Sequence, residues 1–300
     1  PDTLILIDYP GFNLRIAEWA KQQGLKVIYY ISPQVWAWKE NRVKMMKECI
    51  DKMLVILPFE KDYFKTKWNW DVEYVGNPLV EVVQEFVVRN QESGVKDSEL
   101  LTTDSRLIAL LPGSRKQEIA KKLPVMLEVS KFFPDHQFVV AEAPSVEDEF
   151  YKTFTKPYAN ISAVKDKTYD LLLHAKAALV TSGTATLETA LFGVPEVVCY
   201  KGSYLSYQIG KRLVKVKYIS LVNLIMDKLV VKELIQNDLT AENLRQELND
   251  LLSNEQRISI LKNNYADLKK LLSEGGTDSY RGASAKAAAS IFQYLISIKA

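Results

Sequence analysis

The stretch from Val180 to Glu188 combines residue types that could hold a phosphate group. Gly183 would let a ligand approach the backbone closely, and Ser182 and Thr184 supply hydroxyls. A helix that begins here would direct its first free N–H groups, and the positive end of its dipole, at the ligand. We therefore predict that Ser182, Gly183 and Thr184 bind phosphate and that Glu188 accepts hydrogen bonds from a ribose. The alternative is that Thr184 merely caps a helix and Glu188 is solvated.

A second glycine turn, Pro112-Gly113-Ser114-Arg115, offers a cation as well as a hydroxyl. The planar guanidinium of Arg115 could bind a diphosphate or a carboxylate through two parallel hydrogen bonds, which a lysine could not do. Ser114 would add its hydroxyl at the same turn. The alternative is that Arg115 is an ordinary surface arginine beside a loop.

Both turns follow apolar runs that are typical of buried strands, Ala177 to Val180 and Leu107 to Leu111. After the first of these turns, Ala185 to Phe192 has a helical pattern and Val197 to Tyr200 is the next expected strand. A strand, a helix and a second strand joined by short links form a βαβ unit. The sequence therefore predicts an α/β fold with doubly wound parallel sheets, whose ligands bind at the carboxyl ends of the strands.

The beginning of the chain has the same pattern. Leu4 to Ile7 is an apolar run that ends at Asp8, and Val27 to Ile31 is the next expected strand. Between them we expect a helix from Leu14 to Gln23 that is capped by Asn13. Asp8 therefore falls at the carboxyl edge of a first parallel sheet.

A polar stretch from Glu81 to Ser105 carries no strand signal and suggests a domain boundary. We predict a first domain at residues 1–103, a second at 104–282 and a final helix at 283–300 that packs back on the first domain. Because the chain opens directly into a strand pattern at Thr3, we also expect the first domain to be incomplete in this chain.

The composition excludes several classes of protein. The chain has 300 residues with 39 basic and 37 acidic side chains, so its net charge of +2 gives no case for a nucleic-acid binder. Two cysteines, Cys49 and Cys199, and two histidines, His136 and His174, have no ligand spacing around them, so we expect no structural metal. No apolar run approaches the ~18 residues of a membrane span, and nothing resembles a signal peptide, so we expect a cytoplasmic protein.

The region from Trp36 to Trp70 is unusually rich in aromatic and basic residues. If Trp68 and Trp70 were exposed beside Lys65 and Lys67, this surface would suit contact with anionic headgroups and acyl chains. The alternative is that these aromatic side chains form a small core.

Five motifs, spread over nearly the whole chain and in the family's order, resemble those of the lipid-A-disaccharide synthase family. Members of that family are GT-B glycosyltransferases. The motifs are Tyr30-Ile-Ser-Pro-Gln-Val-Trp-Ala-Trp38, Leu57-Pro-Phe-Glu60, Leu110-Leu-Pro-Gly-Ser-Arg115, Ser182-Gly-Thr-Ala-Thr-Leu-Glu188, and Lys211-Arg-Leu-Val214 followed by Tyr218-Ile-Ser-Leu-Val-Asn-Leu224. Any one of them alone is weak, but together they are highly specific.

The resemblance implies an inverting transferase that joins UDP-2,3-diacylglucosamine to 2,3-diacylglucosamine 1-phosphate (lipid X) through a β-1,6 link, with no metal or other cofactor. It implies a homodimer with exchanged C-terminal parts, located peripherally on the inner face of the bacterial inner membrane. Asn223, in the last motif, joins the predicted UDP-binding residues. Inversion requires a base for the acceptor hydroxyl, for which Asp8 is the candidate, and Arg115 would stabilise the departing diphosphate.

Two other readings stay open. A UDP-sugar epimerase or hydrolase of the same fold would need no lipid acceptor, and a UDP-binding fragment would need no catalytic groups. Release of UDP only in the presence of a lipid acceptor would separate the three.

Overall fold

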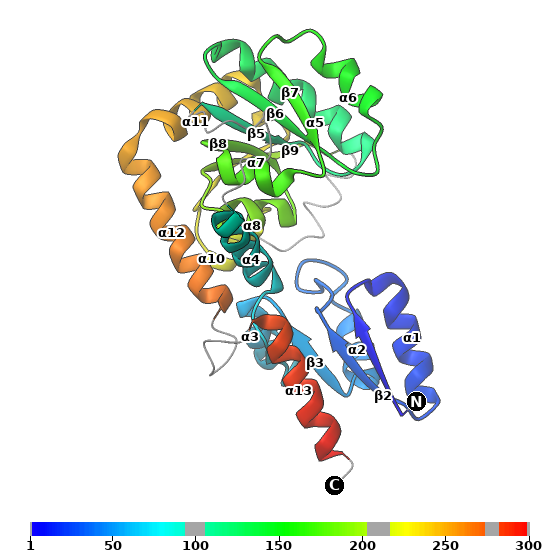
Figure 1. Cartoon of the computed structure of the whole chain (residues 1–300). Helices are drawn as coiled ribbons and strands as arrows, with labels where there is room; N and C mark the ends of the chain where they lie inside the picture. Colours follow the sequence, from blue (N-terminus) through cyan, green and yellow to red (C-terminus); the bar gives the residue numbers. More distant parts are fainter. Residues whose placement is uncertain (1, 94–105, 203–216, 274–281, 299–300) are drawn as a thin grey trace. The chain divides into compact units, whose positions relative to one another are not determined.

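A computed structural model describes residues 2–93, 106–202, 217–273 and 282–298. It confirms the predicted α/β class, because both sheets of the described chain are wholly parallel. The chain divides into two compact units, each described by itself here (Figure 1). The first contains residues up to Val82 and from Lys269 onward, and the second contains Val83 to Ile209 and Lys217 to Leu268.

The first unit holds a four-stranded sheet in the order β1-β2-β3-β4. Its strands are β1 (Thr3–Ile7), β2 (Lys26–Tyr30), β3 (Lys52–Val55) and β4 (Glu73–Tyr74), and its helices include α1 (Pro10–Gln22), α2 (Arg42–Cys49) and α3 (Pro58–Trp68). Each connection steps to the next strand in the same direction. Right-handed crossovers therefore place α1, α2 and α3 on one face of the sheet.

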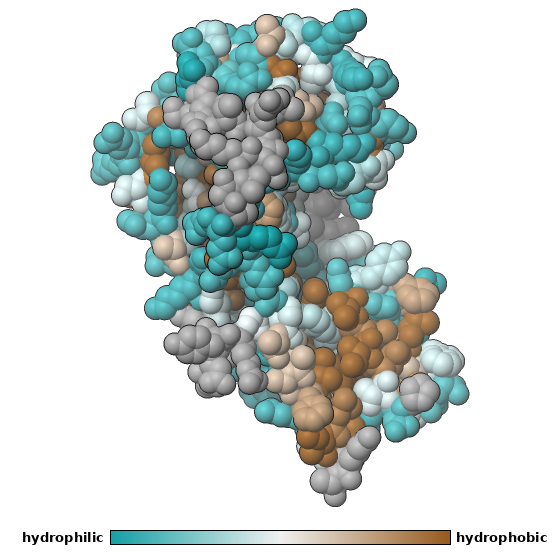
Figure 2. Space-filling model, viewed as in Figure 1, coloured by the Kyte–Doolittle hydropathy of each residue, from teal (hydrophilic) through white to brown (hydrophobic). Residues whose placement is uncertain are grey.

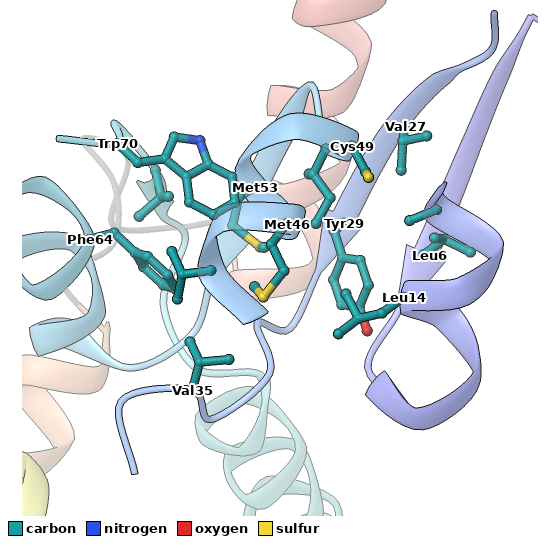
Figure 3. Close-up of a cluster of buried hydrophobic side chains, with 14 of the residues drawn as sticks. Leu6, Leu14, Val27, Tyr29, Val35, Met46, Cys49, Met53, Phe64 and Trp70 are labelled. Atoms are coloured by element: carbon teal, nitrogen blue, oxygen red, sulfur yellow. The ribbon is translucent and has the colours of Figure 1, made fainter. Parts of the chain in front are cut away.

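The core beneath these three helices contains Leu14 of α1, Met46 of α2 and Phe64 of α3, packed on Tyr29 and Met53 of the strands (Figure 3). The opposite face receives a helix from far along the chain, α13 (Ala283–Ser297), whose Ala287 and Ile291 pack against Leu54 and Val75. At one end of α13, the Glu81 carboxylate accepts a hydrogen bond from the Ser284 N–H at 3.2 Å. Glu81 belongs to α4 (Pro78–Ser93), which contributes residues to both units.

The second unit holds a six-stranded sheet in the order β10-β9-β8-β5-β6-β7. The strands are β5 (Leu107–Leu111), β6 (Gln137–Glu142), β7 (Ile161–Lys165), β8 (Ala177–Thr181), β9 (Glu196–Tyr200) and β10 (Lys232–Ile235). Its helices include α5 (Lys116–Val129), α6 (Asp148–Thr155), α7 (Thr168–His174), α8 (Thr184–Leu191), α10 (Leu221–Met226), α11 (Ala241–Ser253) and most of α12 (Glu255–Ser273), whose residues from Lys269 onward belong to the first unit. The order of the strands reverses between β5 and β8, and such a switch point is where open α/β sheets bind ligands.

The start of α1 differs from the prediction. The helix begins at Pro10 rather than Leu14, and Asn13 lies within its first turn instead of capping it. The Asn13 amide donates hydrogen bonds to the carbonyls of Ile7 and Asp8, at 3.0 and 2.8 Å. Because Pro has a fixed φ and no N–H, it suits the first turn of a helix. Asn13 therefore stabilises the turn between β1 and α1 through these two hydrogen bonds.

The predicted membrane surface is corrected in part, since several of its aromatic side chains belong to the core. Trp70 is 9% exposed and Phe64 is fully buried, and both lie in the cluster that also contains Met46 and Met53 (Figure 3). Trp68 is half-buried against the same cluster. The aromatic-core alternative is therefore the better account of this region.

The predicted boundary at residues 103 and 104 lies outside the described residues, and the predicted domain limits stay predictions. The first sheet carries exposed apolar residues on β1, Ile5 and Ile7, and α13 carries Phe292 and Ile296. Hydrophobic residues gather visibly on this unit in the space-filling view (Figure 2).

Candidate functional site

A cavity of about 280 Å³ lies at the switch point of the second sheet. Its lining residues follow the carboxyl ends of β5, β6 and β8 and open α7 and α8: Leu111, Gly113, Ser114, Glu118, Ala141, Glu142, Ala143, Pro144, Thr168, Thr181, Ser182, Gly183, Thr184 and Ala185. Both glycine turns that the sequence singled out thus meet in one cavity. They do so because β5 and β8 are neighbouring parallel strands.

The turn from Ser182 to Thr184 has the geometry of an anion-binding loop. Gly183 has φ 145° and ψ −161°, a conformation that side-chain-bearing residues rarely adopt, and it is the N-cap residue of α8. Thr184 is the first helical residue and makes no side-chain cap, so the alternative reading of Thr184 as a cap is wrong. The first N–H groups of α8 lack helical partners by geometry and face the cavity end of the helix.

Ser182 and Asn223 belong to one hydrogen-bond network. The Ser182 hydroxyl donates to the Ile219 carbonyl at 3.1 Å, and the Ile219 N–H donates to the Glu233 carboxylate at 3.0 Å. Glu233 also accepts from the Asn223 amide at 2.9 Å. Asn223 is fully buried, donates to the Val231 carbonyl and accepts from two backbone N–H groups, which uses its full bonding capacity.

Asn223 does not line the cavity. In this structure it holds the segment that contacts Ser182, so a positioning role fits its geometry better than direct UDP binding. Its predicted contact with UDP stays a prediction. Glu233 had no signal in the sequence, because one glutamate in a short strand is indistinguishable from a solvated residue.

Glu188 is half-buried and accepts a hydrogen bond of 2.8 Å from the Tyr169 hydroxyl. Burial, and then this bond to the carboxylate, raises the pKa of Tyr169, so the phenol stays a donor at neutral pH. The Tyr169 ring lies 5.1 Å from that of Phe192 and 5.4 Å from that of Phe86. Glu188 does not line the cavity, and its carboxylate is held by Tyr169 of the aromatic cluster. Its predicted contact with a ribose stays a prediction.

The second turn places Ser114 and Gly113 in the cavity lining, and Gly113 has φ 119°. Arg115 caps α5 with extended backbone, and its side chain is 81% exposed with Nη1 lying 3.4 Å from the Glu118 carboxylate. The guanidinium does not line the cavity. A long, weakly held cation at the rim can swing toward an arriving anion.

Lys122 is a site residue that our sequence reasoning missed. It lies in α5, is 4% exposed, and its ammonium hydrogen-bonds the hydroxyl of Thr181, which lines the cavity. A Cβ placed on Gly113 would lie 3.6 Å from the Lys122 nitrogen, so this cation sits directly beneath the second turn. Burial lowers the pKa of Lys122, and neighbouring Glu118 opposes that shift.

The helical spacing of Ile119, Lys122, Leu123 and Met126 could have revealed this lysine, since all four positions fall on one face and all four are buried. A buried cation next to a hydroxyl adds positive charge where the sequence showed only a surface arginine.

Glu142 at the end of β6 adds an acidic residue to the cavity lining. It is 8% exposed, and burial, then the nearby Asp148, raises its pKa, while Lys165 and Lys152 oppose the shift. A carboxyl of this kind suits hydroxyl or N–H groups of a ligand and not a phosphate. The cavity thus combines an anion-binding side with a side that accepts hydrogen bonds.

Asp8 belongs to the first unit, whereas the residues that line the cavity belong to the second. Its φ is 47°, and its carbonyl accepts from the Tyr29 hydroxyl at 2.5 Å. Its exposed carboxylate makes no hydrogen bond or ion pair with the described residues. It is therefore available to a substrate at the carboxyl edge of the first sheet.

Within the described ranges, no three histidine, cysteine, aspartate or glutamate side chains group closely enough to hold a metal ion. Nor does the described part of the chain contain a helix both long and apolar enough to span a membrane.

Solved structures that resemble this chain include UDP-GlcNAc 2-epimerase from Neisseria meningitidis bound to UDP-GlcNAc, with a TM-score of 0.66 at 12% identity, covering 98% of this chain and 76% of that one. The calicheamicin glycosyltransferase CalG4 matches with a TM-score of 0.58 at 16% identity, covering 98% and 73%. At these identities the likeness shows the fold alone. Two parallel α/β sheets and a cavity at a switch point define a protein of the GT-B fold class.

The sequence comparisons give the particular family. A model of the family described as lipid-A-disaccharide synthetase matches residues 1–289. The lipid-A-disaccharide synthases of Trichlorobacter lovleyi and Geobacter sulfurreducens are 38% and 39% identical, covering 93% and 92% of this chain and 73% and 72% of their own length. That of Syntrophus aciditrophicus is 40% identical over 91% of this chain and 72% of its own. The chain belongs to the lipid-A-disaccharide synthase family, and its relatives are glycosyltransferases.

Proposed function

We propose that this protein transfers a diacylglucosamine from UDP-2,3-diacylglucosamine to lipid X, with inversion, to give the β-1,6 lipid A disaccharide 1-phosphate and UDP. The observation that carries the proposal is the meeting of two glycine turns in one cavity at the switch point, in a chain of this family. The proposed reaction uses no metal or other cofactor, and cations and N–H groups of the protein would stabilise the departing diphosphate.

The donor nucleotide would bind in the cavity of the second unit. The N–H groups at the start of α8, with Ser182, Gly183 and Thr184, would hold the diphosphate. Arg115 would close on it from the rim, and Ser114 would contribute its hydroxyl. Glu142, which also lines the cavity, would accept hydrogen bonds from ligand hydroxyls or N–H groups. The negative charge that develops on the departing diphosphate would then meet preorganised donors and cations.

Inversion in a single displacement requires a base on the acceptor side. Asp8 is the proposed base, because its carboxylate is exposed and makes no hydrogen bond or ion pair with the described residues. It would take the proton from the acceptor hydroxyl while that oxygen attacks the anomeric carbon.

Both substrates carry acyl chains whose transfer to water costs about 0.8 kcal/mol per CH₂ group, so the enzyme must work at the membrane surface. We place the contact on Tyr9, Phe12 and Trp38, which are 72%, 51% and 52% exposed at the carboxyl edge of the first sheet. The Lys39 ammonium lies 4.2 Å from the Trp38 ring and adds positive charge for anionic headgroups. This location would be the cytoplasmic face of the inner membrane.

Liposome flotation tests this placement. Replacing Phe12 and Trp38 with Ser should weaken binding to anionic vesicles, whereas replacing the exposed Phe132 of the second unit should not. Equal flotation of both variants would remove these residues from the contact. A homodimer with exchanged C-terminal parts is also part of the proposal. Light scattering tests the dimer by measuring whether the molar mass in solution is twice that of one chain.

The reaction itself is tested by supplying UDP-2,3-diacylglucosamine with and without lipid X and measuring UDP and lipid products. The proposal predicts UDP and disaccharide in equal amounts, and only with the acceptor. UDP released without acceptor would indicate a hydrolase. A donor whose sugar has changed configuration would indicate an epimerase. Binding of UDP with neither product would indicate a binding protein.

A further inference from the structure

A second cavity of about 270 Å³ lies at the amino ends of β9 and β10. Because the strands are parallel, this is the edge of the sheet opposite the first cavity. Leu229, Val231, Leu251 and Leu261 give it an apolar wall, and Glu196 is its acidic lining residue. The reaction proposed above uses none of these residues.

Glu196 is the first residue of β9 and only 1% exposed. Neither of its carboxyl oxygens has a hydrogen-bond partner among the residues that the structure describes. Leaving a buried polar group unpaired costs about 1–3 kcal/mol, and more if it is charged, so native structures rarely do so without a functional reason. Two free acceptors beside a cavity are the kind of group that a ligand satisfies.

The charged groups around the cavity do not neutralise Glu196. Arg257 is bound to Glu247 at 2.5 Å and to Asp250 at 2.9 Å, and the Lys232 ammonium lies 3.9 Å from Glu247. Lys232 and Arg257 line the cavity, but their charges are paired with Glu247 and Asp250 outside it, so an ionised Glu196 would be complemented by one positive charge.

We propose that this cavity binds a small organic amine, with the ammonium group on the Glu196 carboxylate and the aliphatic body against Leu229, Val231 and Leu261. The volume lies just below the roughly 300–1,000 Å³ of pockets for drug-sized ligands, and it has room for a small aliphatic amine. The site is independent of the proposed transfer reaction.

The exchange of protons gives the site a distinctive signature. Burial raises the pKa of Glu196 well above its usual value, so the free protein holds a neutral carboxyl there. An arriving ammonium ion keeps its own protons and pairs with the carboxylate, and the carboxyl proton leaves to solvent. Binding should therefore release about one proton, and the affinity should rise with pH until the amine itself deprotonates.

The test is calorimetric titration with 3-methylbutylamine in two buffers of different ionisation enthalpy, with 3-methylbutan-1-ol as the uncharged control. The amine should bind at least tenfold more tightly than the alcohol and release about one proton. Glu196→Gln should remove both the preference and the proton release. Leu229→Ala, at a 61% exposed position, should weaken both ligands equally and leave the proton release unchanged.

An amine that binds no better than the alcohol, or that releases no proton, would overturn the proposal. So would unchanged amine binding by a folded Glu196→Gln variant. If that variant does not fold, the proton count of the wild-type protein and the equal losses in Leu229→Ala still decide the matter.

Discussion

At the scale of single residues, the cations around the first cavity differ in how they could act. Arg115 is exposed and extends from the rim, so it can contact the diphosphate only if it moves. Replacing it with Ala should cost about 2–4 kcal/mol in transition-state stabilisation, by analogy with the loss of one preorganised donor. Steady-state kinetics with Lys116→Ala as the exposed neighbouring control measure this. A turnover equal to that of the control would remove Arg115 from the reaction.

Lys122 is buried and fixed, so its charge acts without movement. Replacing it with Met should lower the affinity for UDP about tenfold, since an anion above the Gly113 turn loses a nearby cation. Because burial lowers the pKa of this lysine, UDP binding should take up a proton at alkaline pH in the wild-type protein. Calorimetry at several pH values checks both effects. The exposed neighbour Lys121, changed to Met, should show neither, and an identical response of the two variants would refute the role.

Glu196 should make stability fall as pH rises. The folded protein retains the carboxyl proton, whereas the unfolded chain releases it above about pH 4.3, so folding weakens from that pH upward. Glu196→Met should therefore gain stability over the wild type between pH 5 and pH 8. A gain of about 1 kcal/mol corresponds to roughly 2–4 °C in the midpoint of thermal unfolding. Glu149→Met, on the surface, should show no such trend, and parallel curves for wild type and Glu196→Met would contradict the argument.

At the scale of elements, the site depends on the segment before α10. Asn223→Ala should free that segment and loosen Ser182, which reduces UDP affinity without touching the ligand. Because four hydrogen bonds of a buried amide are lost, the free energy of unfolding should also fall by about 2–4 kcal/mol. Asn243→Ala, at a half-buried position of α11 outside this network, is the control. Normal UDP affinity in a destabilised but folded variant would leave Asn223 with a purely structural role.

The strand and turn positions of the second unit were predictable because apolar runs end in glycine turns, and parallel strands bring such turns to one edge. Pairing β5 with β8 placed Gly113 and Gly183 in one cavity. The side-chain partners were not predictable, since the bonds of Tyr169 to Glu188 and of Asn223 to Glu233 depend on how neighbouring elements pack, which the spacing of the residues does not reveal. The burial of Trp70 was left open by the sequence, because an aromatic cluster has the same composition in a core as on a surface.

At the scale of the whole molecule, the order of the strands explains why the first sheet is covered both by its own crossover helices and by α13. The first sheet runs in sequence order, so its own crossovers cover one face only, and α13 covers part of the other. In the second sheet the order of the strands reverses between β5 and β8, and the cavity lies at that switch point. The account therefore assigns nucleotide binding to the second unit, whereas Asp8 and the proposed membrane contact belong to the first.

The most direct test of this assignment is hydrogen exchange of the backbone amides with and without UDP. The account predicts slowed exchange at residues 113–115 and 182–186, where N–H groups would bind phosphate, and no change at residues 8–13 of the first unit. Uridine, which lacks the diphosphate, should protect neither turn. Protection by UDP that leaves both glycine turns unchanged would contradict the assignment of this cavity as the nucleotide site.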